Sequence, residues 1–340
     1  MYRAAFGLLL AASVLIAQAY KPEAVARANL GVSLSRQSKY REAIQAYQQA
    51  IAIDPTLPGL YLNLGLAWFK LGHFREAIAA FDKENAQAPG DRVTTLLAMS
   101  YFGFHQYREA AELLKPLVAA QPDNAELSYL LAKCYLWSGQ NSEAMDLFKS
   151  LLARDPNSAA VHMLLGEALD ASYRTAEAAQ EFEAAAKMAP AQPEVHFGLG
   201  YLYWKQKRYG DAEREFREEL KSNPGNAQAD AYLGDTLMKT GRNAAALELL
   251  KTAVQLRPGL HVAHEDLGIL YADDRKDSQA VGEFRQAIRT DPENFDSHYR
   301  LARLYRQMGR AAEADAEFAA VKKLHRKKDE DPLTKISGPQ

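Results

Sequence analysis

The sequence predicts an all-α fold of nine tandem helix-turn-helix repeats, and periodic features that run through its 340 residues predict it. Prolines are spaced by 34, 33, 34, 34, 34, 34 and 34 residues, at Pro55, Pro89, Pro122, Pro156, Pro190, Pro224, Pro258 and Pro292. Columns of alanine and leucine keep the same phase along the chain. A register kept over this many units is the mark of an internal repeat.

Small and large side chains occupy complementary columns of the repeat. The alanine column is Ala43, Ala77, Ala110, Ala144, Ala178, Ala212, Ala246, Ala280 and Ala314. A second small column is Gly31, Gly65, Ala98, Ala132, Gly166, Gly200, Gly234, Gly268 and Ala302, and we expect two backbones to approach closely there. The large column is Tyr47, Phe81, Leu114, Phe148, Phe182, Phe216, Leu250, Phe284 and Phe318. Small residues beside large ones allow helices to interlock.

Each unit reads in order as helix, turn, helix and turn. Apolar residues repeat at helical spacing, and turn signals such as Leu71-Gly72 and Thr240-Gly241 separate the first helix from the second. The proline then ends the second helix, because it lacks an amide donor. The predicted repeats are residues 24–57, 58–90, 91–124, 125–158, 159–192, 193–226, 227–260, 261–294 and 295–326.

The two ends differ from the repeats. Arg3 precedes an apolar run over residues 4–16, and Ala17-Gln18-Ala19 matches a signal-peptidase site, so residues 1–19 are predicted to be a signal peptide. An uncleaved membrane anchor is the alternative. The last helix is expected to run on through Lys327 and Lys328, and the polar C-terminal tail, residues 327–340 overall, is expected to be disordered.

The columns and the 34-residue period resemble those of the tetratricopeptide repeat (TPR) family over about residues 24 to 326. The resemblance implies a right-handed alpha-alpha superhelical solenoid whose first helices line a concave groove. It also implies a protein that binds other proteins. We expect a scaffold or assembly factor that is not an enzyme.

The sequence offers little chemistry for catalysis or for cofactors. No phosphate-binding loop, nucleophile elbow or zinc-protease motif occurs, so we predict no cofactor and no metal. His261, His264 and Glu265 lack a fourth ligand, and the histidines that recur from His162 onward are interpreted as packing residues. Cys134 is the only cysteine and is predicted to lie in the core. The formal charge of −2 gives no reason to expect a nucleic-acid partner.

Apolar and aromatic residues of the first helices are the candidate partner-binding groove. They are Leu62, Leu66, Phe69, Met99, Phe102, Tyr129, Trp137, Met163, Phe197, Tyr201, Trp204, Tyr232 and Met238, with Asp235 as a charge on the rim. Large exposed apolar patches mark interaction sites. The alternatives are that neighbouring repeats bury these side chains or that a dimer covers them.

Two known groove types fit poorly. A carboxylate clamp would need Lys and Asn where Ala28 and Val32 stand, and an asparagine ladder stops after Asn29 and Asn63. Acidic residues of the eighth repeat precede Arg300, Arg303 and Arg306 of the ninth. That change of sign is interpreted as either an orienting feature or a solvated surface.

The expected function is therefore to bind an apolar or amphipathic client segment outside the cytoplasm, in a periplasm or after secretion. The client is a protein or peptide, with no membrane insertion after signal cleavage, and self-association stays open. The alternatives are a non-catalytic subunit of an envelope enzyme complex and a module that binds glycan or lipid.

Overall fold

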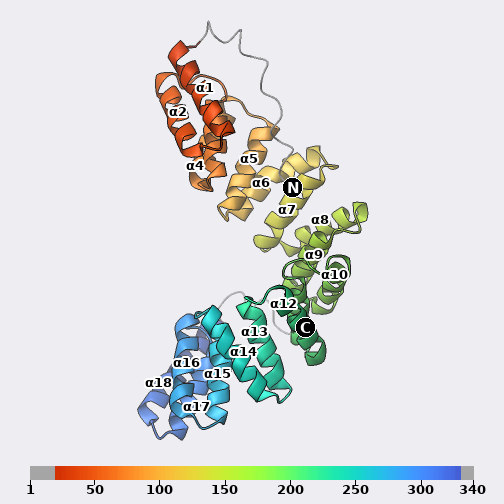
Figure 1. The fold of residues 1–340 in the computed structure, drawn as a ribbon, viewed down its shortest axis with the longest axis vertical. Helices are drawn as coiled ribbons and strands as arrows, with labels where there is room; N and C mark the ends of the chain where they lie inside the picture. Colours follow the sequence, from red (N-terminus) through yellow and green to blue (C-terminus); the bar gives the residue numbers. More distant parts are fainter. Residues whose placement is uncertain (1–19, 331–340) are drawn as a thin grey trace. The chain divides into compact units, whose positions relative to one another are not determined.

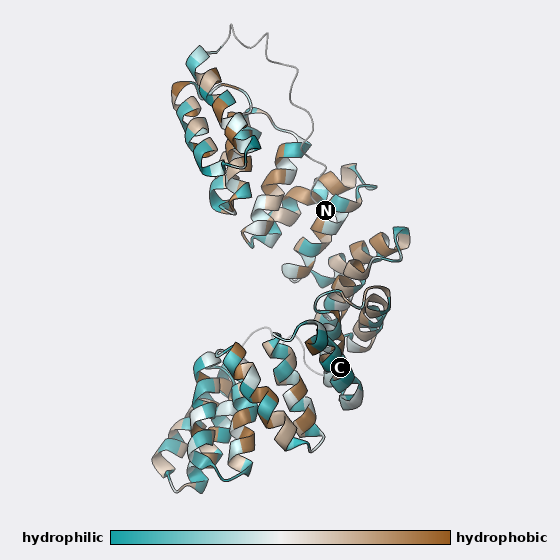
Figure 2. Cartoon of the chain, in the orientation of Figure 1, coloured by the Kyte–Doolittle hydropathy of each residue, from teal (hydrophilic) through white to brown (hydrophobic). Residues whose placement is uncertain are grey.

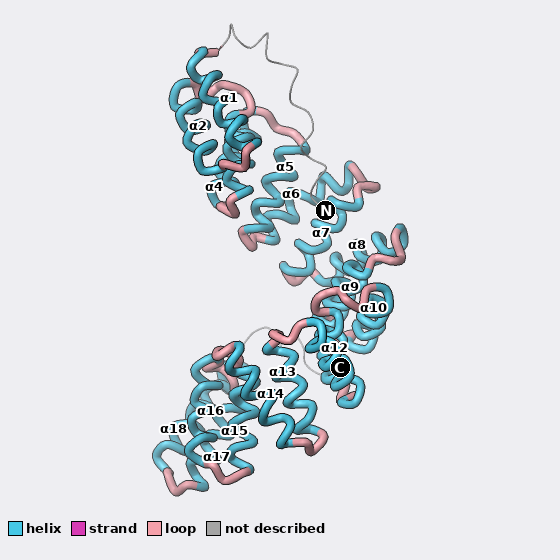
Figure 3. The backbone as a smooth tube through the Cα atoms, in the orientation of Figure 1, coloured by secondary structure: helices cyan, strands magenta, loops and turns pink. Residues whose placement is uncertain are grey.

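Residues 20–330 are described by a computed structural model, with side chains through residue 327. Every regular element in this range is an α-helix, which confirms the predicted fold class (Figures 1 and 3). The predicted signal peptide, residues 1–19, lies outside the described residues, as do residues 331–340. Backbone contacts divide the chain at residues 156 and 157 into an N-terminal unit and a C-terminal unit.

Helices pair into hairpins in both units. The N-terminal unit holds α1 (Pro22–Arg36), α2 (Tyr40–Ile53), α3 (Leu60–Lys70), α4 (Phe74–Gln87), α5 (Asp91–Gly103), α6 (Tyr107–Ala120), α7 (Ala125–Trp137) and α8 (Asn141–Arg154). The C-terminal unit holds α9 (Ala159–Ala171), α10 (Thr175–Met188), α11 (Val195–Lys205), α12 (Tyr209–Ser222), α13 (Ala227–Lys239), α14 (Asn243–Leu256), α15 (His261–Asp273), α16 (Asp277–Thr290), α17 (Phe295–Gln307) and α18 (Ala311–Glu330). These are the helices of nine hairpins.

The turn inside each hairpin closes the first helix with a Schellman motif. In the second repeat, the amide of His73 donates to the carbonyl of Trp68, and that of Gly72 donates to the carbonyl of Phe69. The residue at the turn has a positive φ, which glycine adopts most readily. Gly72, Gly139, Gly241 and Gly309 fill this position in four repeats, and Ser38, His105, Tyr173, Lys207 and Arg275 fill it in the other five.

The recurring prolines follow the second helices, as the sequence predicts. Pro55 comes two residues after the end of α2, and Pro292 comes two residues after the end of α16. The ninth repeat has Arg326 at the proline position, and α18 continues to Glu330. The prediction that a disordered tail begins at residue 327 is therefore wrong for residues 327–330. Without a proline and with basic residues near its C-terminal end, the helix has nothing to stop it there.

Side chains of the second helices fill the space beside the glycine column. A Cβ added to Gly166 would lie 2.6 Å from the ring of Phe182, and one added to Gly65 would lie 2.6 Å from the ring of Phe81. The large column of the second helix therefore packs onto the small column of the first. The backbone also comes close at Gly166, where the added Cβ would lie 3.2 Å from the carbonyl oxygen of Ala178. Phe81, Phe148 and Phe216 are fully buried.

Hydrophobic and hydrophilic residues are both present along the helices of both units (Figure 2). Consecutive helices contact one another within each unit, and odd-numbered helices also meet across repeats at α1/α3, α11/α13, α13/α15 and α15/α17. The odd-numbered helices are thus the more crowded layer, as on the inner side of a curved solenoid. We call their exposed side the first-helix face. The repeated columns also predict that all nine hairpins share one continuous core. Between the two units, at residues 156 and 157, this stays a prediction.

Candidate functional site

The predicted groove residues all lie on odd-numbered helices, from α3 to α13. Most are partly buried, so they are neither solvent-exposed nor closed core residues. Two depart from this pattern. Trp137 is 42% exposed, and Asp235 is only 5% exposed, which corrects its assignment to the rim. Within the N-terminal unit, Leu62, Leu66 and Phe69 pack against the buried core around Phe81.

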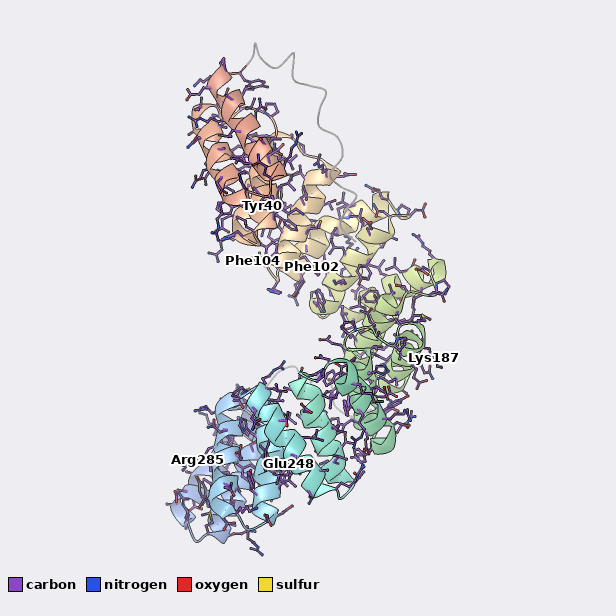
Figure 4. The ribbon with its side chains drawn as sticks, viewed as in Figure 1. Tyr40, Phe102, Phe104, Lys187, Glu248 and Arg285 are labelled. Carbon is purple, nitrogen blue, oxygen red and sulfur yellow. The ribbon has the colours of Figure 1, made fainter. Side chains whose placement is uncertain are left out.

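Three rings at the junction of the third and fourth repeats form the N-terminal aromatic cluster: Phe102, Tyr107 and Trp137. The centroid of Trp137 lies 5.0 Å from that of Phe102 and 5.4 Å from that of Tyr107. Figure 4 labels Phe102 near the end of α5, close to the exposed Phe104. The cluster joins α5, α6 and α7, so two successive repeats are needed to build it.

A cation accompanies the N-terminal aromatic cluster. The Nζ atom of Lys133 lies 4.7 Å from the ring centroid of Trp137, 5.1 Å from that of Phe102 and 5.4 Å from that of Tyr129. An ammonium over aromatic faces is attracted by the ring quadrupoles. A shallow pocket of about 310 Å³ opens beside Trp137, with His105, Tyr107 and Arg108 in its wall.

Tyr107 belongs to the cluster although the sequence analysis did not select it. It is the first residue of α6, a second helix, whereas the search covered only first helices. A signal was available, because Tyr40, Phe74 and Tyr209 begin second helices in other repeats. The aromatic start of a second helix reaches over the turn and meets the end of the first helix, as Phe74 does with Phe69.

The C-terminal aromatic cluster consists of Phe197, Tyr201, Trp204 and Tyr232, on α11 and α13. Tyr201 and Trp204 stack at 5.9 Å, and each meets the ring of Tyr232 edge-on at 5.2 Å. The indole Nε1 of Trp204 donates a hydrogen bond of 2.5 Å to Oδ2 of Asp235. The four rings pack against one another. Here the structure therefore favours the alternative in which neighbouring repeats bury the side chains.

Acidic groups line the inner layer next to this cluster. Burial raises the pKa of Tyr232 to about 12, and Tyr201, Asp235 and Asp266 add to the rise. Burial, followed by the charges of Asp235 and Glu265, also raises the pKa of Asp266 well above its ordinary value. Oδ2 of Asp266 has no hydrogen-bond partner within the described part of the chain. Two buried carboxyl groups, those of Asp235 and Asp266, therefore lie in the inner layer beside this cluster.

An open pocket of about 290 Å³ lies between α15 and α17. Arg275, Arg300 and Arg303 contribute three guanidinium groups to its wall, and Asp273 contributes one carboxylate. Arg300 also reaches Glu265, with 3.5 Å between Nε and Oε1. The change of sign seen in the sequence thus occurs across one concave feature. Both alternatives for it stay open.

The part of the chain that the structure describes holds no candidate metal centre. Among residues 20–327, no three His, Cys, Asp or Glu side chains converge so that they could hold a metal ion. Cys134 is fully buried, as predicted, and burial raises the pKa of its thiol to about 12. A thiol in that state is a weak nucleophile at neutral pH. None of the helices formed by residues 20–330 is long and apolar enough to span a bilayer.

Stacked helical hairpins with part-exposed aromatic residues on one layer define the class of helical repeat scaffolds. Family comparison agrees. Tetratricopeptide repeat profiles match residues 101–168 and 277–331, and residues 163–227 and 197–261, and a TPR repeat profile matches residues 31–72. The chain belongs to the tetratricopeptide repeat family, whose members are protein-interaction scaffolds and are typically not catalytic.

One solved structure shares this architecture over most of the chain, and two others are similar over about half of it. The crystal structure of the APC/C hetero-tetramer Cut9-Hcn1 aligns with a TM-score of 0.59 and 15% identity, over 87% of this chain and 58% of that chain. MamA from residue 41 to its end, from Desulfovibrio magneticus RS-1, aligns with a TM-score of 0.44 and 23% identity, over 51% of this chain and 97% of that chain. YrrB, described as a TPR protein with an unusual peptide-binding site, aligns with a TM-score of 0.42 and 19% identity, over 52% of this chain and 91% of that chain. No curated protein matches the chain.

Proposed function

We propose that this TPR protein is a non-enzymatic scaffold or assembly factor that holds an apolar or amphipathic segment of a client protein on its first-helix face. The N-terminal aromatic cluster is the main anchor. The C-terminal aromatic cluster forms part of the first-helix face of its own unit. Its indole N–H is already bonded to Asp235 and is not available to a client. The predicted residues Met99, Tyr129, Met163 and Met238 flank these clusters on the same layer.

The observation that carries the proposal is the exposure of Trp137 within a preformed cluster. An indole that is 42% exposed and already packed against Phe102 and Tyr107 loses little rotamer freedom when a partner covers it. Aromatic anchors of this type contribute much of the binding energy at protein interfaces. The neighbouring Lys133 favours a segment that carries an acidic residue beside its apolar ones.

A displayed library of random peptides tests this proposal. Selection on the full chain should enrich apolar and aromatic peptides, and Trp137→Ala should weaken their binding by about 1 to 3 kcal/mol. Tyr173→Ala is the matched control, because Tyr173 is 94% exposed, lies at a turn and belongs to neither cluster. Equal loss in both variants, or enrichment that ignores Trp137, would refute the proposed anchor.

The full chain and its Trp137→Ala variant also distinguish the alternative functions from one another. Retention of glycans or of phospholipid vesicles in a Trp137-dependent manner, without peptide enrichment, would indicate a glycan- or lipid-binding module. Recovery of one stoichiometric enzyme after crosslinking in the native cell would indicate a non-catalytic subunit. Concentration-dependent mass in light scattering would indicate self-association that covers the face.

We also propose that the protein works outside the cytoplasm. Support comes from Arg3, the apolar run over residues 4–16 and the Ala17-Gln18-Ala19 site. Intact mass of the natively expressed protein should correspond to a chain that begins at Tyr20. A full-length chain in the cytosolic fraction would contradict export.

A further inference from the structure

Four of the eight histidines occupy one column of the C-terminal unit, and each meets a glutamate 19 residues later. The Nδ1 atoms of His162, His196, His264 and His298 lie 2.6, 2.8, 2.6 and 2.6 Å from the Oε2 atoms of Glu181, Glu215, Glu283 and Glu317. Each pair joins the first helix of a repeat to its second helix. The pairs are thus a repeated connection inside the hairpins.

In the last two repeats the second ring nitrogen is also engaged. Nε2 of His264 lies 3.0 Å from the carbonyl oxygen of Pro258, and Nε2 of His298 lies 3.2 Å from that of Pro292. Both prolines belong to the loop that enters the repeat. His264 and His298 are 8% and 9% exposed, so water has little access to replace either bond.

The protonation of these rings follows from their partners. A carbonyl oxygen only accepts hydrogen bonds, and an ionised carboxylate also only accepts them. A neutral imidazole has one donor, so it can satisfy one of these partners but not both. The imidazolium form has two donors and satisfies both. A proton shared with the glutamate would also fill the site, but a carboxyl group has the lower intrinsic pKa.

We propose that His264 and His298 are clasps that tie the entering loop, the first helix and the second helix of the eighth and ninth repeats together, and that the clasp of the eighth repeat is the imidazolium of His264, which alkaline pH loosens by removing its proton. The proposal does not depend on the proposed function, because it concerns the hairpin interior rather than the first-helix face.

The charged surroundings of each clasp are few. His264 faces Glu283 and Arg289 of α16. The hydrogen bond from Glu283 raises the pKa of His264, while burial and then Arg289 oppose the rise. His298 faces Glu317 of α18. In its entering loop, Glu293 pairs with Lys327 of α18, and Asp291 is a second acidic residue of the same loop.

The seventh repeat lacks the clasp and shows what the column needs. Asp230 stands at the histidine position, and Leu249 stands where the glutamate would be. Asp230 is 4% exposed, and its Oδ2 has no hydrogen-bond partner within residues 20–327. The column therefore places a buried or partly buried titratable group in every repeat of the C-terminal unit, and in four of the five repeats that group is a histidine paired with a glutamate.

The sign of the pH effect follows from the direction of the shift. A histidine whose folded pKa is raised contributes stability that is fully present below its unfolded value of 6.5 and is lost as pH rises through the higher folded value. The affected window for His264 therefore starts near pH 6.5 and extends upward. Deprotonation removes one of the two bonds and leaves a buried acceptor without a donor.

Nitrogen NMR of the histidine rings in the full chain tests the proposal directly. The signal lost in His264→Gln should change from the protonated, two-donor type to the neutral type with a midpoint above 6.5, the ordinary value for histidine. The signal lost in His261→Gln is the matched control for the assignment, because His261 begins the same helix as His264 but has neither bond. A midpoint at or below 6.5 for His264 would overturn the proposal.

A stability measurement covers the case in which the signals cannot be assigned. Hydrogen exchange of the α15 and α16 amides should rise at least about threefold more between pH 6.5 and 9 than that of α11 to α14, after correction for intrinsic exchange. Glu283→Gln should remove much of the extra rise in the eighth repeat, because an amide no longer favours the imidazolium. The same rise in both regions, or no effect of Glu283→Gln, would contradict the clasp.

Discussion

The two aromatic clusters use the same repeat position to opposite effect. Lys133 stands two residues after Leu131, and Asp235 stands two residues after Leu233; both leucines belong to the leucine column of the first helices. Lys133 lies over the rings of Phe102 and Trp137 and leaves the indole exposed. Asp235 is buried and accepts the indole hydrogen of Trp204, whose ring is partly buried. One charge reversal thus separates an exposed indole from a partly buried one.

The physical reason is the difference between a ring face and an indole N–H as a partner. A cation over a ring face keeps part of its hydration and can be displaced. A carboxylate at hydrogen-bond distance from an indole fixes both groups, and a second bond or charge must offset its desolvation. Lys239, with its Nζ 3.5 Å from Oδ1 of Asp235, supplies that charge. The C-terminal aromatic cluster is therefore closer to core than to surface.

Truncating the two indoles should give the largest contrast. Trp204→Ala should lower the free energy of unfolding by about 2 to 4 kcal/mol, since it removes ring contacts and leaves Asp235 without its donor. Trp137→Ala should cost less, about 0.5 to 1.5 kcal/mol, because its indole is 42% exposed but still packs against Phe102 and Tyr107. Urea unfolding followed by circular dichroism measures both. Equal losses would mean that the two clusters do not differ in burial.

The glycine column should respond alike in both units. Gly65→Leu and Gly166→Leu each force a side chain into a ring, of Phe81 or of Phe182, and should cost about 1 to 3 kcal/mol. Ala178→Leu should act similarly, because Ala178 is fully buried. Gly210→Leu is the control, since a Cβ there meets no atom within 4 Å. Thermal unfolding unchanged in all three column variants would show that the packing columns are misassigned.

The charges themselves should differ less than the rings. Asp235→Ala should cost about 1 to 2 kcal/mol, because the Trp204 N–H is left without an acceptor, and Asp235→Asn should recover part of the loss. Lys133→Ala should cost less than Asp235→Ala. Its effect should also shrink in high salt, since a partly hydrated charge is screened. Identical salt dependence of the two variants would place both charges in the same environment.

The smallest expected effect concerns Asp230, whose pKa burial raises to about 6 from 3.8. A raised carboxyl pKa means that stability is lost as pH rises from about 4 to 6 and stays lost above. Asp230→Asn removes the buried charge and should raise the free energy of unfolding by about 1 kcal/mol at pH 8, with no gain below pH 4. Asp146→Asn, at an exposed position, is the control. A gain that is independent of pH would rule out ionisation of Asp230 as its cause.

The sequence alone determined the helices, their hairpins and the buried columns. Proline and glycine act locally, through a missing amide and a permissive φ, so positions such as Pro292 and Gly241 fix where helices end without reference to the fold. The large and small columns also follow from the period. The side chain that fills the space beside each glycine could not be predicted from the period. At Gly166 it is the ring of Phe182, which reaches the glycine across the hairpin.

Only the tertiary structure decided which groove residues are surface and which are packed. Trp137 and Trp204 look equivalent as aromatic residues of first helices, but their exposure depends on neighbours in the next repeat, 31 residues away for Trp204 and Asp235. The histidine column was visible, whereas its glutamate and carbonyl partners required the second helix and the entering loop to be in place. Local periodicity sets the backbone, and contacts between hairpins set the burial and charge of each site.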